Sequence, residues 1–334
     1  MNNTRLISNY LSIFLIAASY FLLSPLVAEA DHNVLRKVAF KCDWYHGIQF
    51  LGFYVAAEKG YYKDEGLDVN IMEVTSIDDL NALAGNVAED RIDIGIGSYA
   101  LPLAQAKGLP LVALASIYQY GPQVFFAKRE KHLTSPKDFK GLRIIDKGES
   151  WKKLLKEFLN ASGLDLSDVV LVKGGFDMTP FYKGEVDIWG GYITNEVQQA
   201  RLKGIEVDTF PAYEYGLTDL GNNIYSSQDY INKHPDIIKS FLKASVKGWY
   251  YAVNHSEESI DILLAMFPDI SRDRTFHLMC FDASTPLVIP PGKKIGYFNC
   301  DNWLNKPIFS GITVSGALCD KTFLENAWKT LNIE

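Results

Sequence analysis

The sequence predicts an α/β protein of two lobes, each a mainly parallel sheet flanked by helices, with two crossings at a hinge. Short apolar strands alternate with helical stretches, which is typical of parallel sheets. A strand–turn–helix unit at residues 92–108 has a counterpart at 186–204, although any two such units share these features. Two stretches that contain Gly and Tyr, 116–123 and about 210–226, are suited to cross between lobes. Two crossings would make a clamp that closes on a ligand.

The first lobe is expected to begin with a strand at 38–42, which runs into a polar and aromatic loop. Ser76 stands three residues before Asp79, which resembles a capping box and predicts a helix start. Further strands are expected at 67–74, 92–96 and 111–115, and helices at 49–59, 76–83 and 98–107.

The second lobe and the C-terminal part show the same alternation at first. Strands are expected at 142–145, 169–172 and 186–189, and helices at 149–160 and from Asn195 to about Gly204. Pro235 opens the longest helix, whose apolar stripe predicts core packing, and a last helix is expected at 323–331. We therefore assign residues 31–122 and 226–334 to lobe one, and 123–225 to lobe two.

Composition limits the function. The chain has 334 residues, 48% hydrophobic and 22% charged, which is enough for two lobes. Its net charge is -7 and it has no basic run, so we expect neither nucleic acid nor an anionic membrane surface as a partner. Aromatic residues make up 13%, and some of them are candidates to line a pocket for a ring.

Residues 1–30 predict a signal peptide. Arg5 precedes a short apolar run at 11–23, and Ala28-Glu29-Ala30 is a cleavage pattern that places the cut after Ala30. The run is too short for a comfortable membrane span, and no Cys at the cut indicates a lipid anchor. Export to a periplasm or beyond follows.

The four cysteines fit no metal motif, because there is no C-x-x-C and no nearby His pair. Cys42 lies in an apolar strand and is expected to be a buried thiol. Export allows a bridge among Cys280, Cys300 and Cys319, with Cys280–Cys300 as one option, and the sequence does not choose.

The stretch 190–196 is the leading candidate for ligand contact. Gly190-Gly191 follows an apolar strand and lets the backbone approach a ligand closely. Tyr192, Asn195 and Glu196 then supply a ring, an amide and a carboxylate. A sheltered Glu196 would accept hydrogen bonds from amino groups, whereas its alternative is a solvated place in a first helical turn. Asn195 could instead cap that helix.

Other candidates lie where strands end, since open α/β sheets bind ligands at the carboxyl ends of their strands. Core packing is the alternative for the aromatic residues, helix capping for Ser98, and a hydrogen-bonded loop position for His46. The candidate ligand-binding residues are Asp43, Trp44, Tyr45, Gln49, Ser98, Tyr118, Gly175, Trp189, Tyr192, Asn195, Glu196 and Tyr215.

Enzyme motifs are absent from the sequence. There is no G-x-S-x-G, no Walker sequence, no H-E-x-x-H and no Rossmann glycine pattern after the first strand. We therefore expect no catalysis, no cofactor and no metal.

Four stretches carry a family pattern. They are 43–56 with Lys59-Gly60-Tyr61-Tyr62 and 65–69; 93–97; 184–187 through Thr194-Asn195-Glu196; and Tyr215-Gly216. Over about residues 37–265 the chain resembles the no-message-in-thiamine family of substrate-binding proteins of ABC importers. The resemblance implies a type II-like periplasmic binding protein fold. It also implies an aminopyrimidine between aromatic rings with carboxylates on the ring edge, which points to Trp44, Tyr192 and Glu196, with Asp43.

The chain departs from the family pattern in places. Gly47 and Phe50 stand where formylaminopyrimidine binders often have Asn and His, and Val197 stands where Pro is usual. These departures affect the identity of the ligand and not the fold. Pyrimidine synthases of the same fold carry a Cys-rich segment and a Lys/His pair after the strand at Gly95, and this chain has neither.

The resulting expectation is a monomeric periplasmic protein that captures a thiamine-related aminopyrimidine and delivers it to an ABC permease in the inner membrane. Two alternatives stay open. The same clamp could bind another small solute, such as a sulfonate, nitrate or a different heterocycle, for which Lys147 and Lys173 are the candidate positive side chains. An enzyme that makes the pyrimidine is the other.

Overall fold

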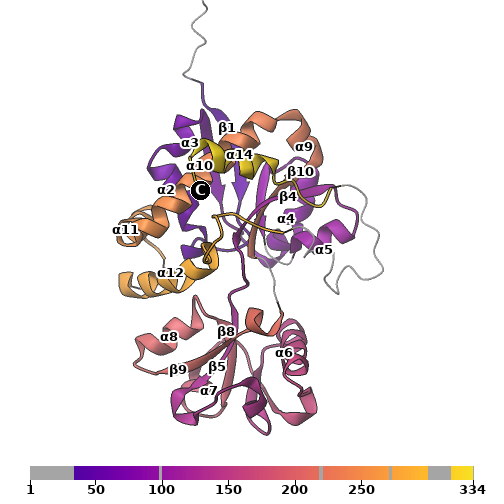
Figure 1. The fold of residues 1–334 in the computed structure, drawn as a ribbon, viewed down its shortest axis with the longest axis vertical. Coiled ribbons are helices and arrows are strands. Elements are labelled where there is room, and N and C mark those ends of the chain that lie inside the picture. Colours follow the sequence, from indigo (N-terminus) through magenta and orange to yellow (C-terminus); the bar gives the residue numbers. More distant parts are fainter. Residues whose placement is uncertain (1–33, 98–99, 218–220, 271–272, 300–316, 334) are drawn as a thin grey trace, which may run out of the picture. The chain divides into compact units, whose positions relative to one another are not determined.

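The computed structural model describes residues 34–333 except 98–99, 218–220, 271–272 and 300–316 (Figure 1). The expected signal peptide and Ser98 therefore lie outside the described residues. Within the described part, no helix is long and apolar enough to cross a membrane.

The strands of the described residues form two sheets of five strands each (Figure 1). In the first, with order β2-β1-β3-β10-β4, β1 runs parallel to β2 and β3, while β10 runs antiparallel to β3 and β4. Its strands are β1 (Arg36–Lys41), β2 (Leu67–Met72), β3 (Ile94–Gly97), β4 (Leu111–Tyr118) and β10 (Gly221–Ser227).

The second sheet repeats this plan with order β7-β6-β8-β5-β9. Strand β6 runs parallel to β7 and β8, and β5 runs antiparallel to β8 and β9. Its strands are β5 (Gln123–Lys128), β6 (Arg143–Asp146), β7 (Val170–Lys173), β8 (Ile188–Tyr192) and β9 (Val207–Pro211). The recurring unit noted in the sequence therefore supplies the central strand of each sheet, β3 and β8.

The two-lobed α/β fold with mainly parallel sheets is confirmed, and in each sheet one strand, β10 or β5, runs antiparallel to its neighbours. The reason is the connection: β5 and β10 each enter a sheet directly after a crossing, without the crossover helix that a parallel neighbour needs. The predicted lobe boundary at 225/226 falls inside β10, all of which pairs in the first sheet.

The two crossings touch each other. Tyr120, between β4 and β5, stacks on Tyr213, between β9 and β10, with ring centroids 5.0 Å apart. The tyrosines noted in both predicted crossings thus pack together where the chain passes between the sheets.

The helices of the described residues divide between the two lobes. Those of the first lobe are α2 (Leu51–Glu58), α3 (Tyr61–Asp64), α4 (Ile77–Ala88), α5 (Ala100–Ala106), α9 (Gln228–Lys233), α10 (Pro235–Asn254), α11 (Ser256–Met266), α12 (Arg274–Val288) and α14 (Thr322–Thr330). Those of the second lobe are α6 (Glu149–Ala161), α7 (Thr179–Tyr182) and α8 (Glu196–Leu202). Single 3-10 turns lie at Ile48–Phe50, Arg129–Lys131, Pro136–Phe139, Leu166–Asp168 and Ala212–Tyr215.

The long helix α10 packs on α2 through two glycines. A Cβ at Gly248 would lie 2.2 Å from the carbonyl oxygen of Gly52, and one at Gly52 would lie 2.2 Å from the Trp249 ring. The predicted stripe forms core: Phe241, Leu242 and Trp249 are fully buried. The capping box prediction is confirmed in part, because the Ser76 hydroxyl accepts a hydrogen bond from the Asp79 backbone N–H, 3.1 Å.

The cysteines require one correction. Cys42 is a buried thiol as expected, and burial raises its pKa. Cys319 is disulfide-bonded, whereas Cys280 is a buried thiol in α12, so the option of a Cys280–Cys300 bridge is wrong.

Candidate functional site

The candidate site lies where the parallel strands β6, β7 and β8 end and their turns begin. Parallel neighbours bring these ends to one edge of the sheet, which is where α/β proteins bind ligands. The side chains that meet there are Lys147 after β6, Trp151 in α6, Phe176 after β7, Trp189 and Tyr192 in β8, and Glu196 in α8.

Glu196 is the first residue of α8, and it is buried at 7% exposure, so the solvated alternative does not hold. Its Oε2 accepts a hydrogen bond from the Tyr192 backbone N–H, 2.8 Å. Gly191 makes this possible, because a Cβ there would lie 3.0 Å from the Glu196 Oε2, closer than real Cβ contacts normally come. The second carboxylate oxygen, Oε1, remains on the side of Lys147.

Gly190 leaves room for an aromatic ring in the same way, because it has no Cβ. A Cβ at Gly190 would lie 3.1 Å from Trp151 and 3.0 Å from Phe125. Without that Cβ, the Trp151 indole packs against β8 and meets the Tyr192 ring edge-on, with centroids 5.8 Å apart. The Gly-Gly pair thus admits an indole and a carboxylate to the end of one strand.

Lys147 sits at the centre of three rings, which we call the Lys147 cage: Trp151, Phe176 and Trp189. Its Nζ lies 4.2, 5.0 and 5.3 Å from their centroids, within the range of cation–π attraction. The side chain is 1% exposed, and Glu196 Oε1 lies 3.9 Å from Nζ. Within the described residues Nζ has no hydrogen-bond partner. Burial lowers the pKa of Lys147, and the Glu196 carboxylate opposes that effect.

Tyr192 closes β8 with its ring 38% exposed. Desolvation raises the pKa of Tyr192 to about 12, with smaller contributions from the carboxylates of Glu196 and Asp43. The phenol therefore stays protonated at neutral pH and can donate a hydrogen bond. The exposed part of the ring is available for stacking.

The loop after β1 presents a second aromatic surface. Trp44 and Tyr45 are 48% and 50% exposed and meet edge-on, with centroids 5.5 Å apart. Gln49 is half-buried, and its carbonyl oxygen accepts a hydrogen bond from the Asn222 side chain, 2.8 Å. The core alternative for Trp44 thus does not hold, and its ring is open to a stacking partner.

His46, in the same loop, is structural. Its Nδ1 lies 2.8 Å from the Tyr54 hydroxyl, and its ring stacks on Phe267 at 3.9 Å. Burial lowers the pKa of His46, and Glu73 partly opposes this.

The remaining candidates are more dispersed. Tyr118 is buried in β4, Tyr215 packs edge-on against Phe158, and Gly175 lies exposed before Phe176. Trp189 is fully buried among core residues and forms the inner wall of the Lys147 cage. Asn195 occupies the N-cap of α8, but its side chain accepts from Gln199 instead of capping.

Two members of the cage were not candidates from sequence: Trp151 and Phe176. Both follow glycine turns after predicted strands, Gly148 and Gly174-Gly175, which was the available signal. Lys147 was named only as a possible anion contact, and its burial depends on three strand ends meeting.

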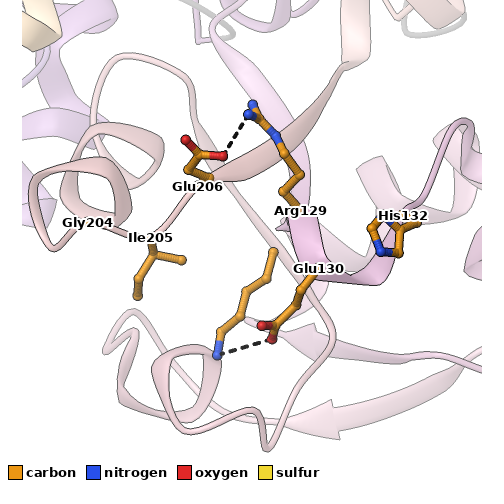
Figure 2. A pocket seen from close by; sticks show the side chains of 7 residues that line it. Arg129, Glu130, His132, Gly204, Ile205 and Glu206 are labelled. Atoms are coloured by element: carbon orange, nitrogen blue, oxygen red, sulfur yellow. Dashed lines mark hydrogen bonds and ion pairs between the residues drawn. The ribbon is translucent and has the colours of Figure 1, made fainter.

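A hollow of about 410 Å³ lies elsewhere on the second lobe, lined by Lys128, Arg129, Glu130, His132 and Gly204–Glu206 (Figure 2). Its charges pair locally: Arg129 with Glu206 at 2.8 Å, and Lys128 with Glu130 at 4.0 Å. None of the candidate residues lines it. In the part of the chain that the structure describes, no group of acidic, His and Cys side chains could hold a metal.

Comparison with known proteins places this geometry in context. A family model described as NMT1/THI5 like matches residues 47–259. The riboflavin-binding protein RibY of Chloroflexus aurantiacus is 31% identical over 254 residues, 74% of this chain and 71% of that protein. A formylaminopyrimidine-binding protein of Halalkalibacterium halodurans is 27% identical over 338 residues, 94% of this chain and 100% of that protein.

Enzymes are also among the relatives. A 4-amino-5-hydroxymethyl-2-methylpyrimidine phosphate synthase of Schizosaccharomyces pombe is 30% identical over 224 residues, 63% of each chain. Among solved structures, the periplasmic sulfonate-binding protein SsuA of Methylobacillus flagellatus has a TM-score of 0.67 at 15% identity, covering 90% of this chain and 96% of that one. At this identity the likeness shows the fold alone.

Proposed function

Because the chain belongs to the NMT1/THI5-like family, we propose that it is an exported solute-binding protein that captures a thiamine-related aminopyrimidine and delivers it to an ABC permease. The periplasmic binding protein fold supports the binding role. The match along the whole length of a formylaminopyrimidine-binding protein supports the ligand class. The proposed location is the periplasm, after removal of residues 1–30.

The pairing of Glu196 with Lys147 carries the proposal. One buried carboxylate and one buried ammonium 3.9 Å apart form a pair without net charge. A sulfonate or nitrate would have to approach Glu196, and a cation would have to approach Lys147, so either would meet repulsion in a poorly solvated place. A neutral ring with an amino group meets none, because Glu196 Oε1 can accept its N–H.

Stacking surfaces support the same class of ligand. Tyr192 and Trp44 both keep a large exposed fraction of their rings, and exposed aromatic faces at strand ends suit a flat heterocycle. Affinity would come from stacking and hydrogen bonds, and no bond in the ligand would be broken.

A flavin is the second candidate, because the relative with 31% identity is named riboflavin-binding. Its ring system also presents an N–H group between carbonyl oxygens, which the same pair can satisfy. A synthase is the third, on the strength of relatives named as pyrimidine phosphate synthases. Mass spectrometry that finds pyridoxal phosphate bound covalently to the native protein would favour it over binding.

The test is calorimetry of the purified protein with 4-amino-5-hydroxymethyl-2-methylpyrimidine and with riboflavin. Glu196→Ala is expected to lower the affinity for the more tightly bound compound by about 100-fold, since it removes a buried charged acceptor. Glu149→Ala, which changes a carboxylate that is 91% exposed at the start of α6, is the matched control and should bind as wild type. Unchanged affinity of Glu196→Ala would exclude the proposed role of Glu196, and no binding of either compound would exclude the proposed ligand class.

A further inference from the structure

The Lys147 ammonium is a buried cation whose hydrogen-bonding capacity is unused. An ammonium carries three N–H donors, yet Nζ has no hydrogen-bond partner among the described residues and is shielded from solvent. The Glu196 carboxylate at 3.9 Å is an ion pair without a hydrogen bond, and three rings supply only cation–π attraction. Leaving a buried donor unsatisfied is costly, so this arrangement needs an explanation.

The walls of the cage are not equally fixed. Trp189 is fully buried, and Trp151 is wedged against Gly190 and Tyr192. Phe176 is different, because it is 70% exposed and follows Gly174-Gly175. It is therefore the one ring of the three that can move without disturbing the core.

We infer that Lys147 is a ligand-contacting residue, whose ammonium donates to an acceptor atom on the ring edge that Glu196 grips, and that Phe176 is the wall that the ligand ring displaces. This inference rests on the proposed function of the site, and it adds which groups on the ring edge of the ligand the two side chains bind. Glu196 Oε1 accepts from a donor on the ligand, and Lys147 Nζ donates to the neighbouring acceptor.

The pair defines a class of ligand more narrowly than Glu196 alone. The ring edge must carry a donor next to an acceptor: an amino group beside an unprotonated ring nitrogen, or an N–H beside a carbonyl. A ring protonated or alkylated at that nitrogen would place a cation against Lys147 and is excluded. Adenine-like, aminopyrimidine-like and lactam edges qualify, and a plain arylamine does not.

The first experiment measures affinity by calorimetry with the two probes named above, for wild type and Lys147→Met. Methionine fills the cage with an apolar chain and removes all three donors, so the probe that binds best should lose about 10- to 100-fold in affinity. Lys173→Met is the control: Lys173 ends the neighbouring strand β7 and is exposed, so its loss should leave affinity within about threefold.

A second ligand separates a direct contact from a structural role. The carbocyclic analogue of the aminopyrimidine, with C–H in place of both ring nitrogens, keeps the amino group and lacks the acceptor. Wild type and Lys147→Met should bind it equally weakly, because the interaction that Lys147 makes is then absent. An equal loss on both ligands, or no loss on either, would overturn the contact. In that case Glu196→Ala still decides the proposed function by itself.

The shielding of Lys147 by Phe176 can be tested by a separate measurement, which needs no ligand. Reductive methylation of the native protein, followed by peptide mass spectrometry, should leave Lys147 unmodified while Lys173 reacts. Phe176→Ala should open Lys147 to methylation, and Phe176→Leu should protect it partly. Fast methylation of Lys147 in wild type, or full protection in Phe176→Ala, would overturn the assignment of Phe176.

Discussion

The two lobes are built on the same unit but use it differently, and the comparison is clearest at two aspartates. Asp93 and Asp187 each stand directly before the central strand of their sheet, β3 or β8. Each accepts a backbone hydrogen bond from the neighbouring strand, Asp93 from the Ala39 N–H at 2.7 Å and Asp187 from the Arg143 N–H at 2.9 Å. The position is thus a structural link common to both lobes.

Their electrostatics are opposite. Burial raises the pKa of Asp93, and its hydrogen bond and His234 oppose this only partly. Burial would raise the pKa of Asp187 too, but Arg143 at 2.9 Å and Lys131 at 2.6 Å outweigh it and hold that pKa well below its usual value. The second lobe thus adds two cations, Arg143 and Lys131, to a link that in the first lobe consists of a backbone N–H with the side chains of Tyr230 and His234 nearby.

The same contrast appears four residues later, at Gly97 and Gly191. At Gly97 an added Cβ would find ordinary contacts, 3.5 Å from Tyr225 and 3.7 Å from Asp43. At Gly191 it would meet the Glu196 side chain at 3.0 Å. Equivalent positions of one scaffold therefore meet ordinary contacts in one lobe and the Glu196 side chain in the other.

The largest effect should come from Asp187→Asn, compared with Asp93→Asn. Removing the charge leaves Arg143 and Lys131 without their buried partner, so we expect a loss of about 2 kcal/mol in the free energy of unfolding. Asp93→Asn should cost less than about 1 kcal/mol, because that carboxylate is penalised by burial and an amide oxygen still accepts from Ala39. Urea unfolding at pH 7 measures both.

The pH dependence gives the control for this pair. A lowered native pKa means that Asp187 stabilises the fold above the unfolded pKa, and that this is lost as pH falls through the lower native value. Asp187→Asn should therefore lose less stability on acidification than wild type. For Asp93 the native pKa is raised, so acidification toward its unfolded pKa favours the fold, and Asp93→Asn should remove that gain. Equal behaviour of the two variants would contradict the comparison.

The second effect concerns affinity, in Gly191→Ala against Gly97→Ala. The methyl group at residue 191 must push the Glu196 carboxylate from its place on the Tyr192 N–H, so we expect about tenfold weaker binding of the preferred heterocycle. At residue 97 the methyl group makes normal van der Waals contact, and affinity should stay within about threefold. Calorimetry on both variants measures the affinity. A larger loss of affinity in Gly97→Ala would mean that the strand end in the first lobe matters more for binding.

Much of this could be predicted from sequence, because it is local. The recurring strand–turn–helix unit, the Gly190-Gly191 break and the start of α8 beside Glu196 all follow from neighbouring residues. The mixed order of the sheets could not, because the direction of β5 and β10 depends on crossings and not on any periodicity within the strands.

The Lys147 cage shows the second limit. Its rings come from residue 151 after β6, residue 176 after β7 and residue 189 within β8, and they meet only when the sheet has formed. The spacing of Trp151 with Leu154, Leu155 and Phe158 is typical of the apolar face of a helix, and nothing local marks Lys147 as buried. Lys147 is buried because of the order of the strands, and not because of its residue type.

The smallest expected effect is on the free energy of unfolding of the ligand-free protein. It is measured by comparing the stability of Lys147→Met and Lys173→Met with that of wild type. An ammonium without hydrogen bonds opposes folding while cation–π contacts partly offset it, so Lys147→Met should stabilise the protein by about 1 kcal/mol at pH 7.

Because the native pKa of Lys147 is lowered, the unfolded chain binds the proton more strongly between the native value and the unfolded value of about 10.4. Wild type should gain stability relative to Lys147→Met as pH rises through that window, and the difference should be smallest above it. Tyr192, whose pKa is about 12, stays protonated throughout the window. Exposed Lys173→Met should differ little from wild type at any pH. A destabilised Lys147→Met with a pH-independent difference would mean that the ammonium is already satisfied in the ligand-free lobe.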